Sequence, residues 1–389
     1  MRNFYKIIVT IRLKFWLNVK KGKDMLKQFT SFVAVASVSA FLAVSLSGCE
    51  EKKEEKAQEA APQKAASAPA PTQSTLEKVK SRGHLQCGIN TGLAGFAYTN
   101  DKGAWEGFDV AYCRALAAAV LGDPNKVKYT NLTGKTRFPA LQSGEIDVLS
   151  RNTTWTFSRD VDLKFTFIGV SYYDGQGFIG RKKLGVKSAK DLNGVSICIQ
   201  TGTTTEMNLA DFFRTNKMKY EPVPIETNAE ARTAYLAERC DVYTTDASGL
   251  AATKSTFKDA DNHMVFPEII SKEPLGPLVR HGDDQWGDIA RWTLNALIVA
   301  EELGVNKGNV ATMAEGTKNP EINRLLGKEG TLGEKLGLDL QWAVRAIQAG
   351  GNYAEIFEKY LGVNTPLGLA RGLNALYNQG GILYAPPVR

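Results

Sequence analysis

Hydrophobic and polar residues between positions 75 and 255 form blocks that predict strands followed by helices. Short apolar runs bounded by glycine or polar residues are typical of buried strands, and longer runs with one apolar face are typical of helices. Strands are expected at 85–90, 127–132, 195–200 and 241–245. Helices are expected at 108–120, 138–142, 206–213 and 229–237. This alternation predicts an α/β protein with doubly wound, mostly parallel sheets.

The pattern becomes mainly helical after position 280. Helices are expected there at 284–303, 309–315, 341–349 and 353–360. The whole chain has 389 residues, of which 43% are hydrophobic. It can therefore bury a large core, and it is long enough for two or more domains.

Two segments end a predicted strand in polar residues. Residues 143–159 (SGEIDVLSRNTTWTFSR) offer Asn152 and, further on, the guanidinium of Arg159. Residues 235–248 (YLAERCDVYTTDAS) repeat this plan, and aligning the two Asp-Val pairs places Asn152 opposite Asp246. Open α/β sheets bind ligands beyond the carboxyl ends of their strands. The two segments therefore predict two halves that face one cleft.

The charges of the two segments are complementary to a zwitterion. Arg159 can clamp a carboxylate with two parallel hydrogen bonds, and Asp246 can receive an ammonium group. An α-amino acid carries both groups. Two simpler interpretations remain: Arg159 can be a surface residue that bridges to Asp160 or Asp162, and Asp246 can be the N-cap of a helix at 247–253.

Residues 200–206 (QTGTTTE) lie where a strand gives way to a helix. Gly202 permits a tight turn, and Thr203 and Glu206 have the spacing of a capping box. The free N–H groups of such a helix start, with the hydroxyls of Thr203 and Thr204, can hold a carboxylate. N-capping alone is the simpler interpretation of this motif.

The chain resembles the periplasmic solute-binding proteins of amino-acid ABC transporters, and most of all the general L-amino-acid-binding branch. The resemblance covers about residues 75–389. The segments that carry it are GFDVAYCRALAAAV (107–120), ALQSGEIDVLSRNTTWTFSRD (140–160), YYDGQGFIGRK (172–182), QTGTTTEMNLADFFR (200–214), CDVYTTDASGL (240–250), EIISKEPLGPLVRHGDDQW (268–286) and GGILYAPPVR (380–389).

The resemblance implies a two-lobed periplasmic-binding-protein fold. Each lobe is expected to be a doubly wound, mostly parallel sheet, and two crossover hinge strands are expected to join the lobes. The first lobe would comprise residues 75–178 and 270–389, including a helical C-terminal extension, and the second lobe residues 179–269.

The resemblance also implies roles for particular residues. Arg159 and the 200–206 turn match the positions that bind the α-carboxylate, and Asp246 matches the carboxylate that receives the α-ammonium group. Asn152 and Thr154 match further ligand contacts. The loop 90–96 matches a pocket wall in which Phe96 is either an apolar cover or ordinary core. Arg151 departs from the family pattern, and it can point into the cleft or to the surface.

The implied function is the capture of L-amino acids, with broad specificity, and their delivery to an ABC permease by a monomer without a cofactor. Alternatives on the same fold are an enzyme, such as a periplasmic dehydratase, and a sensory module. No nucleophile–base pair or paired acids stand out, so we predict no catalytic residue. With three histidines and no Cys-x-x-Cys pair, a metal site is not expected either.

The formal charge of +7 is concentrated at the start of the chain. Residues 1–49 hold eight Lys or Arg residues and one acid, which leaves 40 basic against 40 acidic residues in the remainder. The body of the chain therefore lacks the basic footprint of a nucleic-acid-binding protein.

Residues 25–49 read as an export signal, with a lysine followed by an apolar run and small residues before Cys49. The ending Leu-Ser-Gly-Cys resembles a lipobox, which implies lipidation of Cys49 and a lipid-anchored periplasmic protein. Ordinary signal-peptidase cleavage and a retained anchor helix are the alternatives. Residues 50–74 are rich in Ala, Pro and charge, which predicts a flexible tether.

Four cysteines remain after Cys49, namely Cys87, Cys113, Cys198 and Cys240. They allow three disulfide pairings, and an oxidising compartment favours disulfides over free thiols. Within the two-lobed fold, pairing Cys87 with Cys113 and Cys198 with Cys240 leaves hinge motion free. A pairing across the lobes would lock the cleft, and four buried free thiols are the remaining alternative.

Overall fold

The structure is a computed structural model in which residues 73–389 are described. The predicted export segment 1–49, Cys49 and nearly all of the predicted tether lie outside the described residues. Within the described part, no helix is both long enough and apolar enough to cross a membrane.

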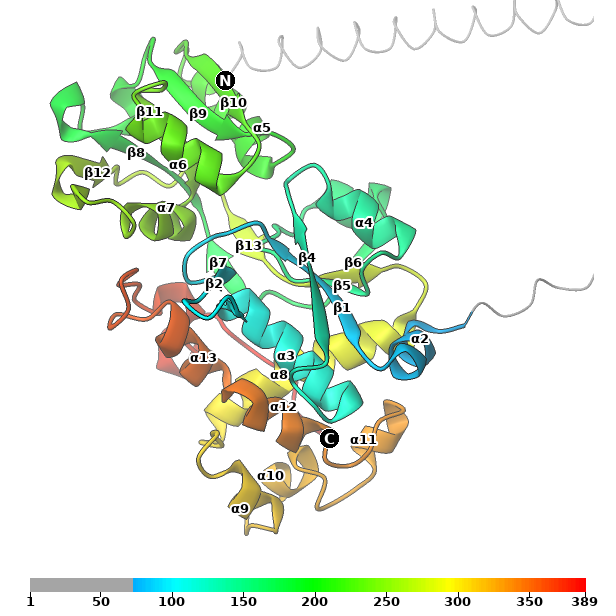
Figure 1. Cartoon of the computed structure of the whole chain (residues 1–389). Helices are drawn as coiled ribbons and strands as arrows, with labels where there is room; N and C mark the ends of the chain where they lie inside the picture. The colour runs from blue at the N-terminus through cyan, green and yellow to red at the C-terminus, as the bar shows by residue number, and fades with distance from the viewer. Residues whose placement is uncertain (1–72) are drawn as a thin grey trace, which may run out of the picture. The chain divides into compact units, whose positions relative to one another are not determined.

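Two five-stranded sheets form the framework (Figure 1). The first has the strand order β4-β1-β5-β14-β6. Its strands are β1 (Leu85–Asn90), β4 (Val127–Leu132), β5 (Val148–Leu149), β6 (Phe165–Phe167) and β14 (Leu278–Arg280). β1 runs parallel to β4 and β5, whereas β14 runs antiparallel to β5 and β6.

The second sheet repeats this plan with the order β10-β9-β11-β8-β12. Its strands are β8 (Gln176–Arg181), β9 (Ser196–Gln200), β10 (Glu221–Ile225), β11 (Val242–Asp246) and β12 (His263–Val265). β9 is parallel to β10 and β11, and β8 is antiparallel to β11 and β12. We call the first sheet with its covering helices the first lobe, and the second sheet with its helices the second lobe.

A two-stranded ribbon joins the lobes. It pairs β7 (Tyr172–Asp174) with β13 (Glu273–Leu275) in antiparallel register, with Glu273 opposite Asp174. The chain passes along β7 from the first sheet to the second and returns along β13. The two predicted crossovers are thus confirmed, and with them the two-lobed α/β fold.

The first lobe is covered by helices from both ends of its sequence. Its early helices are α2 (Thr75–Arg82), α3 (Phe108–Leu121) and α4 (Arg137–Ser143), and a short hairpin of β2 (Tyr98–Thr99) and β3 (Trp105–Glu106) precedes α3. The second lobe carries α5 (Thr204–Thr215), α6 (Asn228–Leu236) and α7 (Ala247–Lys254).

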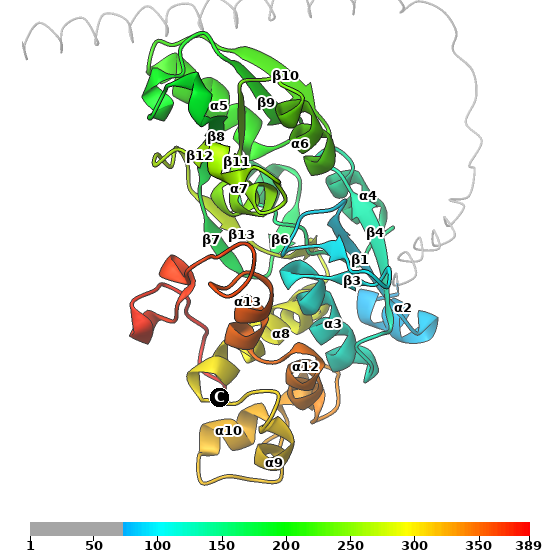
Figure 2. The same cartoon turned by 60° about the vertical axis from the view of Figure 1, so that its left-hand side comes forward.

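The C-terminal region contains six further α-helices, among them the four predicted from sequence, and two short 3-10 helices at Gly372–Asn374 and Tyr377–Gln379. The α-helices are α8 (Asp284–Glu302), α9 (Val310–Ala314), α10 (Pro320–Leu325), α11 (Leu332–Lys335), α12 (Trp342–Gly350) and α13 (Tyr353–Tyr360). In Figures 1 and 2, α8, α12 and α13 lie against α3. The C-terminal extension therefore belongs to the core of the first lobe.

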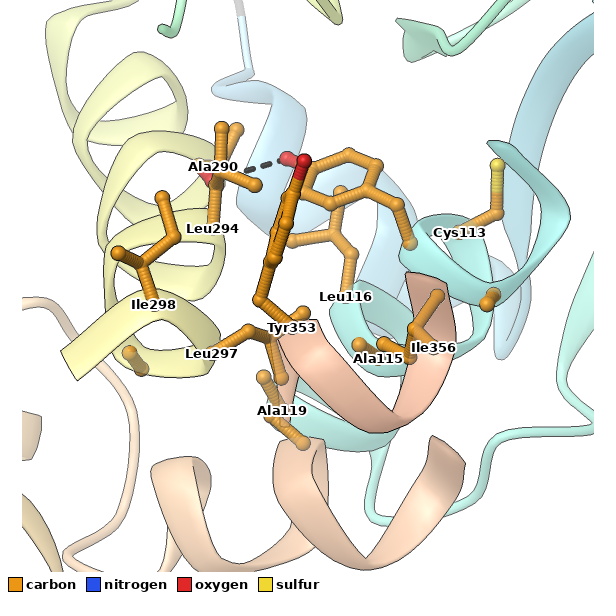
Figure 3. Close-up of a cluster of buried hydrophobic side chains, with 14 of the residues drawn as sticks. Cys113, Ala115, Leu116, Ala119, Ala290, Leu294, Leu297, Ile298, Tyr353 and Ile356 are labelled. Atoms are coloured by element: carbon orange, nitrogen blue, oxygen red, sulfur yellow. Dashed lines mark hydrogen bonds between the residues drawn. The ribbon is translucent and has the colours of Figure 1, made fainter. Parts of the chain in front are cut away.

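Figure 3 shows how these helices pack. Side chains of α3, α8 and α13, among them Leu116, Leu294 and Ile356, meet in one buried cluster. The two tyrosine hydroxyls in this region are satisfied: Tyr112 donates to the Ala290 carbonyl (2.8 Å) and Tyr353 to the Ser171 carbonyl (2.7 Å). Tyr353 thereby connects the C-terminal helices to the residue just before the ribbon strand β7.

Both predicted disulfides form. Cys87 of β1 bonds to Cys113 of α3, and Cys198 of β9 bonds to Cys240, which lies two residues before β11. Each disulfide lies within one lobe, so neither restrains movement of one lobe relative to the other.

Candidate functional site

A small polar cavity lies where the strand ends of the two sheets face each other. Its volume is about 20 Å³, close to that of one water molecule, so an amino acid enters only when the lobes separate. The lining residues are Arg137, Arg151, Asn152, Thr154, Gln200, Thr203, Thr204, Thr205, Asn228, Thr245 and Asp246.

The lobes are in contact around this cavity. The Asn90 amide donates to Asn228 Oδ1 across the cleft (3.3 Å), and the hydroxyls of Thr154 and Thr204 lie 3.2 Å apart. These bonds join side chains of the first lobe to side chains of the second. The structure therefore represents a closed arrangement of the lobes.

Asn152 is held in an uncommon backbone conformation. Its φ of 24° lies at the edge of the left-handed region, which asparagine tolerates better than most residues. The Asn152 N–H donates to Asp109 Oδ2 (3.0 Å), and the Ser150 hydroxyl donates to the Asp109 carbonyl (3.0 Å). Asp109, in the first turn of α3, thus fixes the loop after β5, a role that the sequence did not suggest.

Arg159 lies in a π-helical turn, Ser158–Asp162, directly behind the cavity wall. Its Nη1 donates to the Thr154 carbonyl (2.8 Å), and its guanidinium lies 5.1 Å from the centre of the Phe138 ring. The side chain is buried and does not line the cavity in this closed arrangement. Burial lowers the pKa of Arg159 to about 10, against the opposing effect of Glu273 and Asp246. It makes no surface ion pair with Asp160 or Asp162 within the described residues.

Two further arginines line the cavity. Arg151 is buried, and its Nε donates to the Leu132 carbonyl (2.9 Å), so it belongs to the cavity wall and not to the surface. Arg137 is 2% exposed, and its Nη1 donates to the Thr153 hydroxyl (3.1 Å). Among the described residues, Arg137 Nε is a buried nitrogen without a hydrogen-bond partner.

Sequence reasoning missed Arg137, although one signal was present. Arg137 is the first residue of α4, where a cation meets the positive end of the helix dipole. The pKa of Arg137 is lowered well below its usual value, mainly by burial and next by the positive charges of Arg159 and Arg151. The negative charges of Asp246 and Glu273 raise it in part. A buried cation at such a place is stabilised by an anion.

Asp246 supplies the negative charge of the second lobe. It stands at the N-cap position of α7, yet within the described residues its side chain accepts no capping hydrogen bond. The carboxylate is therefore not used to begin the helix. Burial, then the nearby Asp174 and Glu273, raise the pKa of Asp246 well above its usual value, while Asn152 and Arg137 oppose the rise. A cation beside Asp246 would stabilise the ionised carboxylate and lower this pKa.

The two threonines at the start of α5 have different partners. Thr203 is the N-cap: its hydroxyl accepts from the Glu206 N–H (3.2 Å) and donates to the Gln200 carbonyl (2.7 Å). Thr204 instead donates to Glu273 Oε2 (2.9 Å) and contacts Thr154 of the first lobe. Capping thus accounts for the Thr203 hydroxyl, and the Thr204 hydroxyl lies in the contact between lobes.

Glu273, on the ribbon strand β13, joins both lobes and was not foreseen from sequence. It is 1% exposed, and its carboxylate accepts from the hydroxyls of Thr154 and Thr204 and from the Asn208 amide (2.7 Å). Thr154 belongs to the first lobe, and the other two donors belong to the second. The hinge itself therefore carries an acid that bonds to both sides of the closed cleft.

Phe96 lies apart from the cavity. Its ring is 1% exposed and packs edge-on against Phe108 (6.2 Å) and Tyr172 (5.7 Å) in the core of the first lobe. Of the two alternatives for Phe96, these contacts favour ordinary core packing over an apolar cover of the ligand. The other predicted residues Asn152, Thr154, Thr203, Thr204 and Asp246 line the cavity together.

Two α/β lobes that meet over a charged cleft and are joined by a two-stranded ribbon are typical of proteins that close on a solute. The chain belongs to the bacterial extracellular solute-binding proteins, family 3, whose sequence profile matches residues 85–363.

Two relatives match most of the chain. The glutamate/glutamine/aspartate/asparagine-binding protein BztA of Rhodobacter capsulatus is 61% identical over 316 residues, which are 81% of this chain and 94% of the relative. The general L-amino acid-binding periplasmic protein AapJ of Rhizobium johnstonii is 58% identical over 327 residues, which are 84% of this chain and 96% of the relative.

A solved structure is also similar throughout. It is an ABC transporter periplasmic binding protein from Brucella ovis with glutathione bound. That chain is 55% identical and superposes with a TM-score of 0.79, over 82% of this chain and 100% of the other.

Proposed function

We propose that this protein captures L-α-amino acids with broad specificity outside the cytoplasm and delivers them to an ABC permease. The observation that carries the proposal is the placement of opposite buried charges across the cleft. Asp246 of the second lobe has no capping bond within the described residues, and three arginines of the first lobe, Arg137, Arg151 and Arg159, lie in or behind the facing wall.

The two charged groups of an amino acid fit this arrangement. The α-ammonium group binds Asp246, and the α-carboxylate binds Arg159 and the N–H groups at the start of α5. Asn152, Thr154 and Thr204 complete the set of contacts. Because these groups come from both lobes, the ligand stabilises the closed arrangement more than the open one.

Arg137 and Arg151 are available to the ligand's side chain. BztA is named for glutamate, glutamine, aspartate and asparagine, and AapJ for L-amino acids in general. Glutathione, bound to the Brucella ovis protein, also keeps a free α-ammonium and α-carboxylate group on its γ-glutamyl residue. We therefore place acidic and amide amino acids among the ligands that bind with highest affinity.

The proposal includes the location and organisation of the chain. The protein acts in the periplasm as a monomer, anchored through a lipid on Cys49. Its lobes divide within the ribbon strands β7 (Tyr172–Asp174) and β13 (Glu273–Leu275), because the boundary expected at 178/179 falls inside β8 (Gln176–Arg181) of the second sheet. Metabolic labelling with a fatty acid tests the anchor, because a Cys49→Ala variant should lose the label.

Calorimetry with a panel of L-amino acids tests the binding function. Decarboxylated and N-acetylated analogues should bind far more weakly, because each lacks one of the two groups that Arg159 and Asp246 recognise. Arg159→Ala should cost about 2–5 kcal/mol of binding free energy, whereas Arg214→Ala, which changes an exposed arginine, should cost nothing measurable.

Three results would contradict parts of the proposal. Amines without a carboxylate that bind as well as amino acids would show that Arg159 has another role. A new product in the incubated samples would support the enzyme alternative. A melting temperature of ligand-free Arg159→Ala far below that of the unaltered protein would assign this arginine to the fold.

A further inference from the structure

A second and larger cavity adjoins the polar one. Its volume is about 330 Å³, which lies in the range of small-molecule sites. The first lobe contributes the loop 91–94 and the β2–β3 hairpin, with Tyr98 and Trp105, and the second lobe contributes the starts of α6 and the last turns of α7. We call it the outer cavity and the 20 Å³ cavity the inner one.

Asn228 lines both cavities. Its Oδ1 accepts from the Asn90 amide of the first lobe, and its Nδ2 donates to Gln200 Oε1 (3.2 Å) and to the Tyr243 hydroxyl (3.3 Å). The contact between Asn90 and Asn228 crosses the cleft, so it breaks whenever the lobes separate. A ligand side chain that starts in the inner cavity can then pass this point and end in the outer one.

The outer cavity favours an anion. Among the described residues that line it, Arg232 alone is charged, and Arg232 forms no ion pair within residues 73–389. The positive end of the α6 dipole lies at the same wall, where Asn228 and Ala229 begin the helix. The rings of Tyr98 and Trp105 offer apolar surface to the atoms between the two ends of a long ligand.

We infer that the outer cavity is a subsite for amino acids whose side chain is extended by an amide and ends in a second carboxylate, as in γ-glutamyl dipeptides. The γ-linkage leaves the α-ammonium and α-carboxylate groups free for the inner cavity, whereas an ordinary α-linked peptide bond consumes one of them. The distal carboxylate binds Arg232. This inference rests on the proposed function, because the inner cavity holds the α-groups.

Calorimetry with three ligands tests the inference. L-Glutamate is short enough to occupy the inner cavity alone, whereas γ-glutamylglycine is long enough to occupy both cavities. γ-Glutamylethylamide is about as long as γ-glutamylglycine but lacks the second carboxylate. We expect γ-glutamylglycine to bind at least as tightly as L-glutamate and about tenfold more tightly than γ-glutamylethylamide, because one charge-assisted hydrogen bond is lost.

Variants identify the residue responsible. Arg232→Ala should weaken γ-glutamylglycine binding about tenfold and leave L-glutamate within twofold, and Arg232→Lys should restore part of the loss. Arg239→Ala is the matched control, since Arg239 is exposed just beyond α6 and does not line the outer cavity. It should change neither affinity.

The outcomes separate the two proposals. If no L-amino acid binds, the proposed function fails and the subsite fails with it. If L-glutamate binds but γ-glutamylglycine neither binds nor competes, only the subsite is wrong. Equal losses for both ligands in Arg232→Ala would likewise overturn the subsite, because they would assign Arg232 to closure of the lobes.

Discussion

The two lobes share one strand plan but are stabilised differently. In the first lobe, one face of the sheet is covered by a large apolar cluster that runs from α3 into α8, α12 and α13. In the second lobe, two small clusters cover the two faces of the sheet. The comparison shows that the same strand plan can be supported by one large and one small core or by two small cores, with one disulfide inside each lobe.

The lobes also differ in what they bring to the cleft. The first lobe supplies the cations Arg137, Arg151 and Arg159, and the second supplies Asp246 and the start of α5. Both sets lie beyond the carboxyl ends of the parallel strands. The shared topology therefore fixes where the ligand groups are, and the different residues decide which end of the ligand each lobe holds.

The largest expected effect comes from the core of the first lobe. Phe357 of α13 is fully buried and stacks on Tyr172 and Tyr353, so Phe357→Ala should lower the free energy of unfolding by about 3–5 kcal/mol. Urea unfolding measures the loss. Hydrogen exchange should localise it to the first lobe, whereas Phe213→Ala, at an equally buried ring of α5, should weaken the second lobe.

Uniform loss of exchange protection in both variants would show that the lobes unfold as one unit. The difference between the large core of the first lobe and the small cores of the second would then not give the lobes separate stabilities.

Removal of the second lobe's disulfide should have the next largest effect. Cys198 and Cys240 are 42 residues apart and Cys87 and Cys113 are 26 apart, so loop entropy assigns each disulfide about 3–4 kcal/mol, slightly more for the longer loop. A Cys198→Ser/Cys240→Ser double variant should therefore lose more stability in urea than the corresponding double variant of the first lobe. The reverse order would mean that the large core of the first lobe depends on its disulfide.

Asp109 should make the first lobe sensitive to pH. Burial raises the pKa of Asp109 to about 7, against the Asn152 N–H and the charge of Arg151. Between about pH 4 and 7, the folded protein therefore keeps a proton on Asp109 that the unfolded chain releases. The stability that this protonated carboxyl contributes is fully present below about pH 4 and is lost as pH rises to about 7. Asparagine does not ionise, so Asp109→Asn should remove this pH-dependent loss of unfolding free energy. The loss amounts to about 1.4 kcal/mol for each pH unit between about pH 4 and 7.

Urea unfolding of the Asp109→Asn variant at several pH values measures the slope. The advantage of the variant over the unaltered protein should grow from pH 4 to 7 and stay constant above. An advantage that does not change with pH would show that Asp109 is ionised throughout in the folded protein.

The smallest expected effect concerns the ribbon. Asn374, in the C-terminal segment, accepts from the Tyr173 N–H (2.7 Å) and donates to the Tyr173 carbonyl (3.2 Å) on the edge of β7. Asn374→Ala should cost about 1 kcal/mol of stability and change ligand affinity by no more than a few-fold. Asn378→Ala, at an exposed position of the same segment, is the control. A large affinity change would mean that this segment controls closure.

Strands β1, β4, β9 and β11 and the long helices followed from local pattern, whereas β6, β10 and β12 were not predicted. The site followed only in part. The residue patterns of β1 (LQCGIN) and β4 (VKYTNL) gave the bounds of both strands to the residue. The helices α2, α10 and α11 were not predicted. Asn152 and Asp246 were predictable because Asn152 follows β5 closely and Asp246 ends β11.

Other site residues depend on contacts between distant parts of the chain. Glu273 meets Thr154 over a separation of 119 residues, and Asp109 meets Asn152 over 43. No local pattern contains such pairs. The choice between the two alternatives for Phe96 also depended on a distant contact, because its neighbour Tyr172 comes from the ribbon.

Glu273 ties the rate of lobe opening to one hinge carboxylate. Because Thr154 belongs to one lobe and Thr204 and Asn208 to the other, each opening event must break the bonds of Glu273 to at least one lobe. Hinge motions of this kind take microseconds to milliseconds, and bonds made only in the closed form slow the opening step. The residence time of a bound solute, and thus the time in which a loaded molecule can meet a permease, depends in part on an acid that does not line the cavity.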